Sequence, residues 1–141
     1  MKRDEIKTFM PHRTPMLLMD EVRVDQDGSV WGSYQVRGDE FFLQGHFPGF
    51  PVVPGVILCE IIAQSAGILV KDKLQQGMMP LFIGIEKARF HRMVRPDDQV
   101  DTHCRLVRRV GMMMKVKGEA HVAGELCAEG VFLMMLTNLD D

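Results

Sequence analysis

Residues 45–70 read GHFPGFPVVPGVILCEIIAQSAGILV, and this stretch decides the fold. Its first eleven residues contain three prolines and three glycines, a composition that excludes a regular helix or strand. We expect a rigid loop, because each proline fixes its own φ and restricts the residue before it. A helix should begin near Pro54, since proline suits the first helical turn, and should run to about Lys73. Gly77 and Pro80 follow as stop signals.

The predicted helix is apolar on nearly every side. Between Val56 and Val70 the only strongly polar side chains are Glu60, Gln64 and Ser65. A helix that is apolar all round is enclosed by protein, so the rest of the chain must cover it.

Six other segments are predicted to be strands, on the basis of their alternating or apolar patterns and the turns between them. Asp27-Gly28 is a strong hairpin signal, and Ala123-Gly124 can turn the chain before the last strand. The last strand is apolar on both faces and should be central. The six segments are Leu17–Asp25, Ser29–Arg37, Leu81–Phe90, Val100–Val110, Met112–Val122 and Leu126–Leu136. They predict an α+β fold, in which a mostly antiparallel β-sheet wraps around one long central α-helix.

Length and composition indicate a single globular domain over residues 1–141. The chain has 141 residues, of which 46% are hydrophobic and 26% are charged. A domain of this size cannot frame a cleft between two lobes, so an active site must lie within it or between subunits. The 12 methionines either fill the core or line a flexible surface for an apolar ligand.

Several classes of protein are disfavoured by the same data. A net charge of −2 argues against a nucleic-acid-binding protein. The three cysteines are far apart, which suits the reducing cytoplasm better than a disulfide framework. The first residues lack the apolar core of a signal peptide, and the run Val56–Val70 is shorter than the roughly 20 apolar residues of a membrane span. We therefore expect a cytoplasmic protein.

Glu60 is the first candidate for chemistry, because it interrupts the most apolar stretch of the chain. A carboxylate in such a place must pair, change its ionisation or take part in a reaction. Gln64 lies one turn later on the same face and can hydrogen-bond Glu60. The alternative is a structural role for Glu60 at a subunit contact.

His46 is the second candidate, because the rigid loop holds it just before the helix. Pro54-Gly55 then presents free backbone N–H groups, which stabilise negative charge on an oxygen. A base, an acid and a helix N-terminus can remove a proton beside a carbonyl and expel a β-hydroxyl. The spacing leaves open whether His46 and Glu60 meet within one chain or across a dimer.

Other known chemistries find little support. No HxxxH, HExxH or CxxC spacing indicates a metal site, and no glycine-rich phosphate loop or GxSxG motif occurs. His12 suggests only a role in shaping the entry to a strand. In residues 85–117, however, Lys and Arg outnumber Asp and Glu by nine to four, which indicates either a solvated strand face or a dock for an acidic partner or phosphate.

A set of motifs extends over nearly the whole chain. The most specific is the segment from Gly45 to Gln64, and the others are Pro11-His12-Arg13, Leu17-Leu18, Asp39–Phe42, Gly84–Phe90 and Val94-Arg95-Pro96. Together they resemble the FabZ-type 3-hydroxyacyl-(acyl-carrier-protein) dehydratases. The resemblance implies a hot-dog fold and a homodimer with two composite sites, assembled into a trimer of dimers.

The resemblance also implies roles for individual residues. His46 would abstract the C2 proton, and Glu60 would protonate the departing 3-hydroxyl. The Gly55 N–H would polarise the thioester carbonyl, Gln64 would orient Glu60, and Phe47 would contact the substrate. That substrate would arrive on the phosphopantetheine of acyl carrier protein, with no metal or redox cofactor.

Three alternatives to plain dehydration stay open. Related enzymes that also isomerise the double bond carry Asp at the position of Glu60, so glutamate favours plain dehydration. A hot-dog thioesterase would also use a carboxylate near a helix start. A non-catalytic acyl-carrier or lipid-binding module would bind without turnover.

Overall fold

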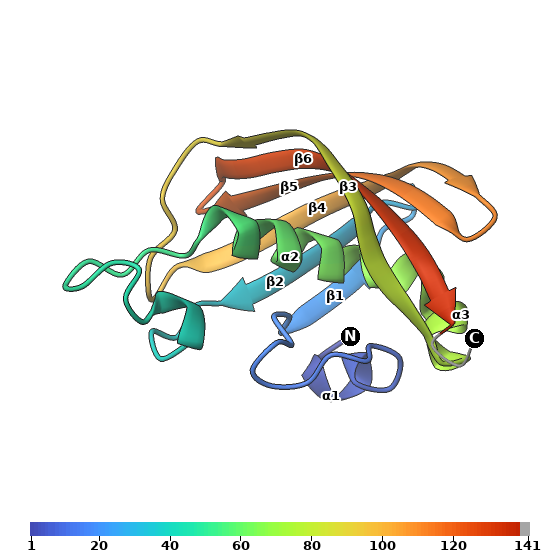
Figure 1. The fold of residues 1–141 in the computed structure, drawn as a ribbon, viewed down its shortest axis with the longest axis horizontal. Coiled ribbons are helices and arrows are strands. Elements are labelled where there is room, and N and C mark those ends of the chain that lie inside the picture. The colour runs from blue at the N-terminus through green and yellow to red at the C-terminus, as the bar shows by residue number, and fades with distance from the viewer. Residues whose placement is uncertain (139–141) are drawn as a thin grey trace.

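A computed structural model describes residues 1–138 of the chain. Six antiparallel strands form one sheet in the order β1-β2-β4-β5-β6-β3. The strands are β1 (Glu21–Val24), β2 (Val30–Gln35), β3 (Met78–Phe90), β4 (Gln99–Val110), β5 (Met113–Val122) and β6 (Glu125–Asn138). The predicted α+β hot-dog architecture is confirmed, because the sheet curves around the helix α2 (Gly55–Ala66), as Figure 1 shows.

The hydrophobic core lies between α2 and the sheet. The helix contacts β2, β4, β5 and β6, and its residues from Leu58 to Ala66 are buried except for Glu60. Phe132 on β6 is the largest fully buried side chain. β6 lies between β5 and β3, so the strand that is apolar on both faces is an interior strand, as predicted.

The helical stretch differs from the prediction of one helix up to Lys73. The α-helix ends at Ala66, and a 3-10 turn, η2 (Gly67–Val70), and a short helix, α3 (Lys71–Gln75), continue it. The break falls at Gly67, where the Met10 Sδ would lie 2.7 Å from an added Cβ. Pro54 is the N-cap residue, so the helix begins one residue later than proline's preference suggested.

The first predicted strand is also too long, since β1 covers only Glu21–Val24. The Leu18 N–H donates to Gln64 Oε1 at 2.8 Å rather than to a neighbouring strand. Before this segment lies the short helix α1 (Arg3–Ile6), and η1 (Phe41–Leu43) precedes the proline-rich loop.

The helix is not enclosed at its first turn. Val56 is 74% exposed, in contrast to the fully covered helix that the sequence predicted. The sheet covers α2 on one side only, and no other described segment lies over Val56. All three cysteines are buried and free, and burial raises the pKa of Cys104 to about 12. Within residues 1–138, no helix has the length and apolar character needed to cross a membrane.

Candidate active site

The loop before α2 fixes the orientation of the His46 ring. His46 Nδ1 lies 2.9 Å from the carbonyl oxygen of Val52, and the Val52 N–H donates back to the His46 carbonyl at 2.8 Å. A carbonyl oxygen can only accept, so Nδ1 carries the proton in this contact. In the neutral ring Nε2 then holds the lone pair, which is the arrangement a general base requires.

The start of α2 lies beside this ring. His46 and Gly55 line a cleft of about 540 Å³, which we call the His46 cleft and which also includes Val53, Val56, Phe90 and Met93. The Phe90 ring packs so closely on Gly55 that an added Cβ would lie 2.8 Å from Cε1. No described side chain caps the helix. Its first N–H groups lack intrahelical acceptors, so they can donate to an oxyanion.

Phe47 lies at the surface next to His46. Its ring stacks on the imidazole with centroids 4.3 Å apart, and its side chain is 56% exposed. The Phe47 ring therefore covers one face of the imidazole.

Glu60 lies in a different pocket. We call it the Glu60 pocket, and it has a volume of about 30 Å³, lined by Met10, His12, Glu60, Gln64, Phe82, Met114 and Met134, among others. This volume is far smaller than that of the His46 cleft. The carboxylate is 21% exposed, so the apolar stretch does not bury it completely. Met10, Met114 and Met134 in this wall are all buried.

Gln64 ties Glu60 to the N-terminal segment. Its Nε2 donates to the Met16 carbonyl at 2.7 Å and lies 3.5 Å from Glu60 Oε1, while its Oε1 accepts from Leu18. The amide is buried and held at both ends, so it cannot turn freely. The predicted contact between Gln64 and Glu60 is present in the structure.

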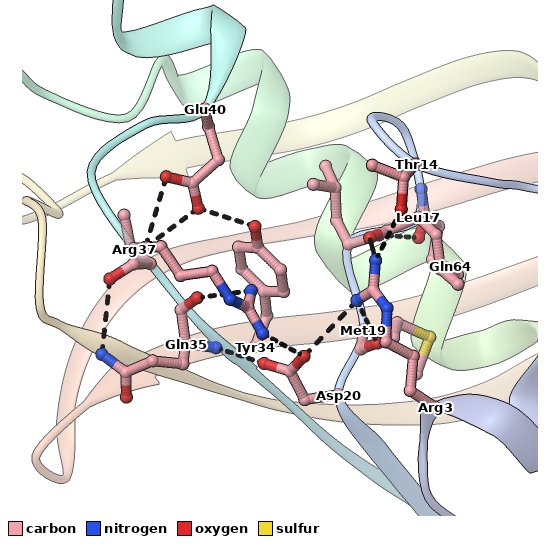
Figure 2. A network of polar contacts seen from close by, with 12 residues as sticks. Arg3, Thr14, Leu17, Met19, Asp20, Tyr34, Gln35, Arg37, Glu40 and Gln64 are labelled. Atoms are coloured by element: carbon pink, nitrogen blue, oxygen red, sulfur yellow. Dashed lines mark hydrogen bonds and ion pairs between the residues drawn. The ribbon is translucent and has the colours of Figure 1, made fainter.

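Figure 2 shows that Gln64 lies at one end of a larger polar network. The Arg3 guanidinium donates to the carbonyl oxygens of Leu17 and Met19 and contacts Asp20, which also accepts from Arg37. This network anchors the segment that passes over Glu60.

His12 contacts Glu60, which the sequence pattern did not predict. Its Nε2 lies 3.6 Å from Glu60 Oε1, and its side chain is 21% exposed, like that of the glutamate. The separation of 48 residues hides this contact from any local pattern. The sequence feature that could have indicated this contact is the Pro11-His12-Arg13 motif, which is part of the family resemblance.

The structure therefore divides the predicted site residues between two pockets. His46 and Gly55 share the His46 cleft, and Glu60 and Gln64 share the Glu60 pocket, and no residue lines both. Within residues 1–138 no group of three or more His, Cys, Asp or Glu side chains is placed to hold a metal ion.

Comparison with known proteins places the chain in a family. Residues 10–130 match the model of the FabA-like domain. A protein of Nitratidesulfovibrio vulgaris strain DP4, named 3-hydroxyacyl-(acyl-carrier-protein) dehydratase FabZ, is 42% identical over 141 residues, covering 97% of this chain and 92% of its own. A protein of the same name from Petrotoga mobilis is 37% identical, covering 95% and 96%.

A solved structure supports the same fold. The dehydratase heterocomplex ApeI:P from Xenorhabdus doucetiae matches with a TM-score of 0.81 at 19% identity, covering 96% of this chain and 92% of that one. With these matches, the chain belongs to the FabA-like family.

Proposed function

We propose that this protein dehydrates (3R)-3-hydroxyacyl-acyl-carrier-protein to the trans-2-enoyl product in type II fatty-acid biosynthesis. The observation that carries the proposal is the base geometry of His46 beside a helix N-terminus, together with Glu60, in a FabA-like chain whose relatives are named FabZ dehydratases. The enzyme is a hydro-lyase.

Each step of the elimination has a group suited to it. The Nε2 of His46 takes the proton from C2, and the electrons of that bond form the C2–C3 double bond. The Gly55 N–H donates to the thioester oxygen, where negative charge develops. Glu60 gives its proton to the 3-hydroxyl, the C3–O bond breaks, and water leaves. The proton that His46 took from C2 then passes to Glu60, so both groups regain their starting protonation states.

The two groups meet in this proposal across a homodimer, with His46 from one subunit and Glu60 from its partner. The support comes from β3, an edge strand that pairs only with β6 within residues 1–138. From Leu81 to Phe90 its residues are exposed, except for half-buried Gly84. A long, apolar, unpaired edge strand is a template for pairing with another chain. Exposed Val56 at the start of α2 would be covered in the same assembly.

A trimer of such dimers is the larger assembly that we propose. A second group of exposed apolar side chains supports it, near the tip of the β4–β5 hairpin: Leu106, Val107, Val110 and Met112. These side chains form an exposed apolar surface on the single chain, and contacts with further subunits would bury it.

Acyl carrier protein is the proposed partner that presents the substrate on its phosphopantetheine. Arg92 and Met93 line both the His46 cleft and an adjoining surface hollow that includes Arg95. Arg92 and Arg95 at the mouth of the cleft suit an acidic carrier and its phosphate, and Asp97 and Asp98 line the same hollow. The proposed reaction takes place in the cytoplasm, uses no metal or redox cofactor, and involves neither nucleic acid nor a membrane.

The test is hydration of a crotonyl thioester, followed by ultraviolet absorbance, in the wild-type protein and in His46→Ala and Glu60→Gln. Losing a positioned base or acid should lower the rate by about 10²- to 10⁴-fold. Folded variants that keep full activity would contradict the assignment. Release of free thiol, measured with a trapping reagent, would instead indicate a thioesterase, and binding without turnover would indicate a lipid-binding module. With a trans-2-enoyl thioester longer than four carbons, formation of a cis-3 product would reveal isomerase activity.

A further inference from the structure

We infer that His12 is a positioning residue for Glu60, and that it holds the carboxyl group through Oε1 so that Oε2 faces the substrate. The inference rests on the proposed dehydration. It concerns which residue orients the acid and which oxygen transfers the proton.

The first observation is the contact itself. His12 Nε2 lies 3.6 Å from Glu60 Oε1, and Gln64 Nε2 lies 3.5 Å from the same oxygen. Both distances exceed those of ordinary hydrogen bonds, yet such contacts in a free enzyme often tighten when substrate binds. No residue within 1–138 makes a polar contact with Oε2. One oxygen of the carboxyl group is therefore held from two sides, and the other is available.

The second observation concerns the other ring nitrogen. His12 Nδ1 is buried and has no hydrogen-bond partner among the described residues. A proton on Nδ1 would be a buried donor without an acceptor, which is costly. In the neutral tautomer that carries its proton on Nε2, Nδ1 is an unpaired acceptor instead, and the single donor of the ring faces Glu60. It orients the carboxyl group without adding a fixed positive charge beside the acid.

The third observation is that the backbone around His12 is held in place. The Arg13 guanidinium donates to the carbonyl oxygens of Met10 and His12 at 2.7 Å each, and to Lys7 at 3.1 Å. Gln64 anchors the chain at Met16 and Leu18. A ring on a segment pinned on both sides keeps its direction, which a positioning group requires.

Substitutions that differ in reach test the inference. In His12→Gln the side-chain amide places its nitrogen near the position of Nε2, whereas in His12→Asn it falls near Nδ1 and cannot reach Glu60. We expect His12→Leu and His12→Asn to lower kcat for crotonyl thioester hydration by roughly 10-fold with KM nearly unchanged, a smaller loss than removal of the acid itself. His12→Gln should recover most of the wild-type kcat.

The matched control is His121→Leu. His121 also contacts a glutamate, with Nε2 3.2 Å from Glu119 Oε2, and its exposure is similar at 22%, but it lines neither the His46 cleft nor the Glu60 pocket. We expect its kcat to equal that of the wild type.

The outcomes separate the two proposals. An inactive wild-type protein contradicts the proposed function. An active wild type with an inactive Glu60→Gln, but with His12→Asn and His12→Gln both at the wild-type kcat, contradicts only the positioning role. Equal losses in Asn and Gln also overturn it, because reach would then not matter. The Asn and Gln pair decides the question even if His12→Leu does not fold.

Discussion

The His46 cleft and the Glu60 pocket are built in opposite ways. The cleft is open, at about 540 Å³, and its histidine is held by a local backbone contact six residues away. The pocket is small, at about 30 Å³, and its glutamate is approached by the His12 side chain, 48 residues distant, and by Gln64, which the backbone of Met16 and Leu18 holds. One part depends on a stiff loop, and the other depends on tertiary packing.

This difference teaches how a small chain can host acid–base chemistry. Each pocket holds one of the two proposed catalytic groups, and neither pocket holds both. The open cleft has room for a substrate, whereas the Glu60 pocket does not. For a substrate to reach Glu60, either the methionines of the pocket must move or a second chain must complete the site. The sharpest experiments therefore treat the two regions separately.

The largest effect should come from mixing two inactive variants. His46→Ala and Glu60→Gln should each lose about 10²- to 10⁴-fold in rate. If the sites are composite, subunit exchange between them should restore about one quarter of the wild-type activity, because half of the dimers are mixed and each has one intact site. Crotonyl thioester hydration before and after exchange measures this. A mixture that stays inactive after proven exchange would place His46 and Glu60 of one chain in one site.

The second prediction compares the two edges of the sheet. Leu81 on β3 and Val24 on β1 are both 48% exposed on edge strands. We expect Leu81→Lys to prevent strand pairing, reduce the mass in light scattering to that of a monomer, and lower activity by about 10²-fold as the composite site is lost. Val24→Lys should change neither. Full activity in a Leu81→Lys monomer would refute the dimer model.

A glycine from each region gives the third prediction. An added Cβ at Gly55 meets the stiff Phe90 ring, whereas at Gly67 it meets the flexible end of Met10. Gly55→Ala should lower the free energy of unfolding by about 1–3 kcal/mol. Gly67→Ala should cost less than about 1 kcal/mol, because Met10 can move and alanine favours the helix. Urea denaturation measures the free energy of unfolding of both variants. A larger decrease in Gly67→Ala than in Gly55→Ala would contradict the prediction and show that the Glu60 pocket adapts less easily.

The smallest effect concerns Glu40, which lies at the start of η1, before the proline-rich loop. Partial burial acts to raise the pKa of Glu40, but hydrogen bonds from the backbone N–H groups of Arg37 and Gly38 and from the Tyr34 hydroxyl outweigh it and lower the pKa below 4.5. Its contribution to stability is present above pH 4.5 and is lost as the pH falls through the lowered pKa.

Glu40→Gln should therefore melt below the wild type at pH 7, and the gap should narrow below pH 4.5. Thermal melts across this range measure the gap. Asp39→Asn, at an exposed neighbouring position, is the control, and a gap that widens in acid would contradict the assigned contacts.

Much of the fold was predictable because it depends on local patterns. The proline-rich loop, the apolar helix and six strands follow from spacing that the structure reproduces, with β1 shorter and the helix broken at Gly67. The missed details share a cause. The Leu18 N–H donates to Gln64 instead of to a strand, and Gly67 packs closely against Met10, so both positions contact side chains that are distant in the sequence.

The sequence by itself determined the residue types of the proposed site: a histidine in a rigid loop, a glutamate in an apolar helix, and a helix that begins at Gly55 with free N–H groups. These are matters of residue type and local backbone restriction. Only the tertiary structure decided that His12 lies against Glu60 and that His46 and Glu60 occupy different pockets. Contacts between distant segments depend on how the whole sheet curves around α2, which no local pattern encodes.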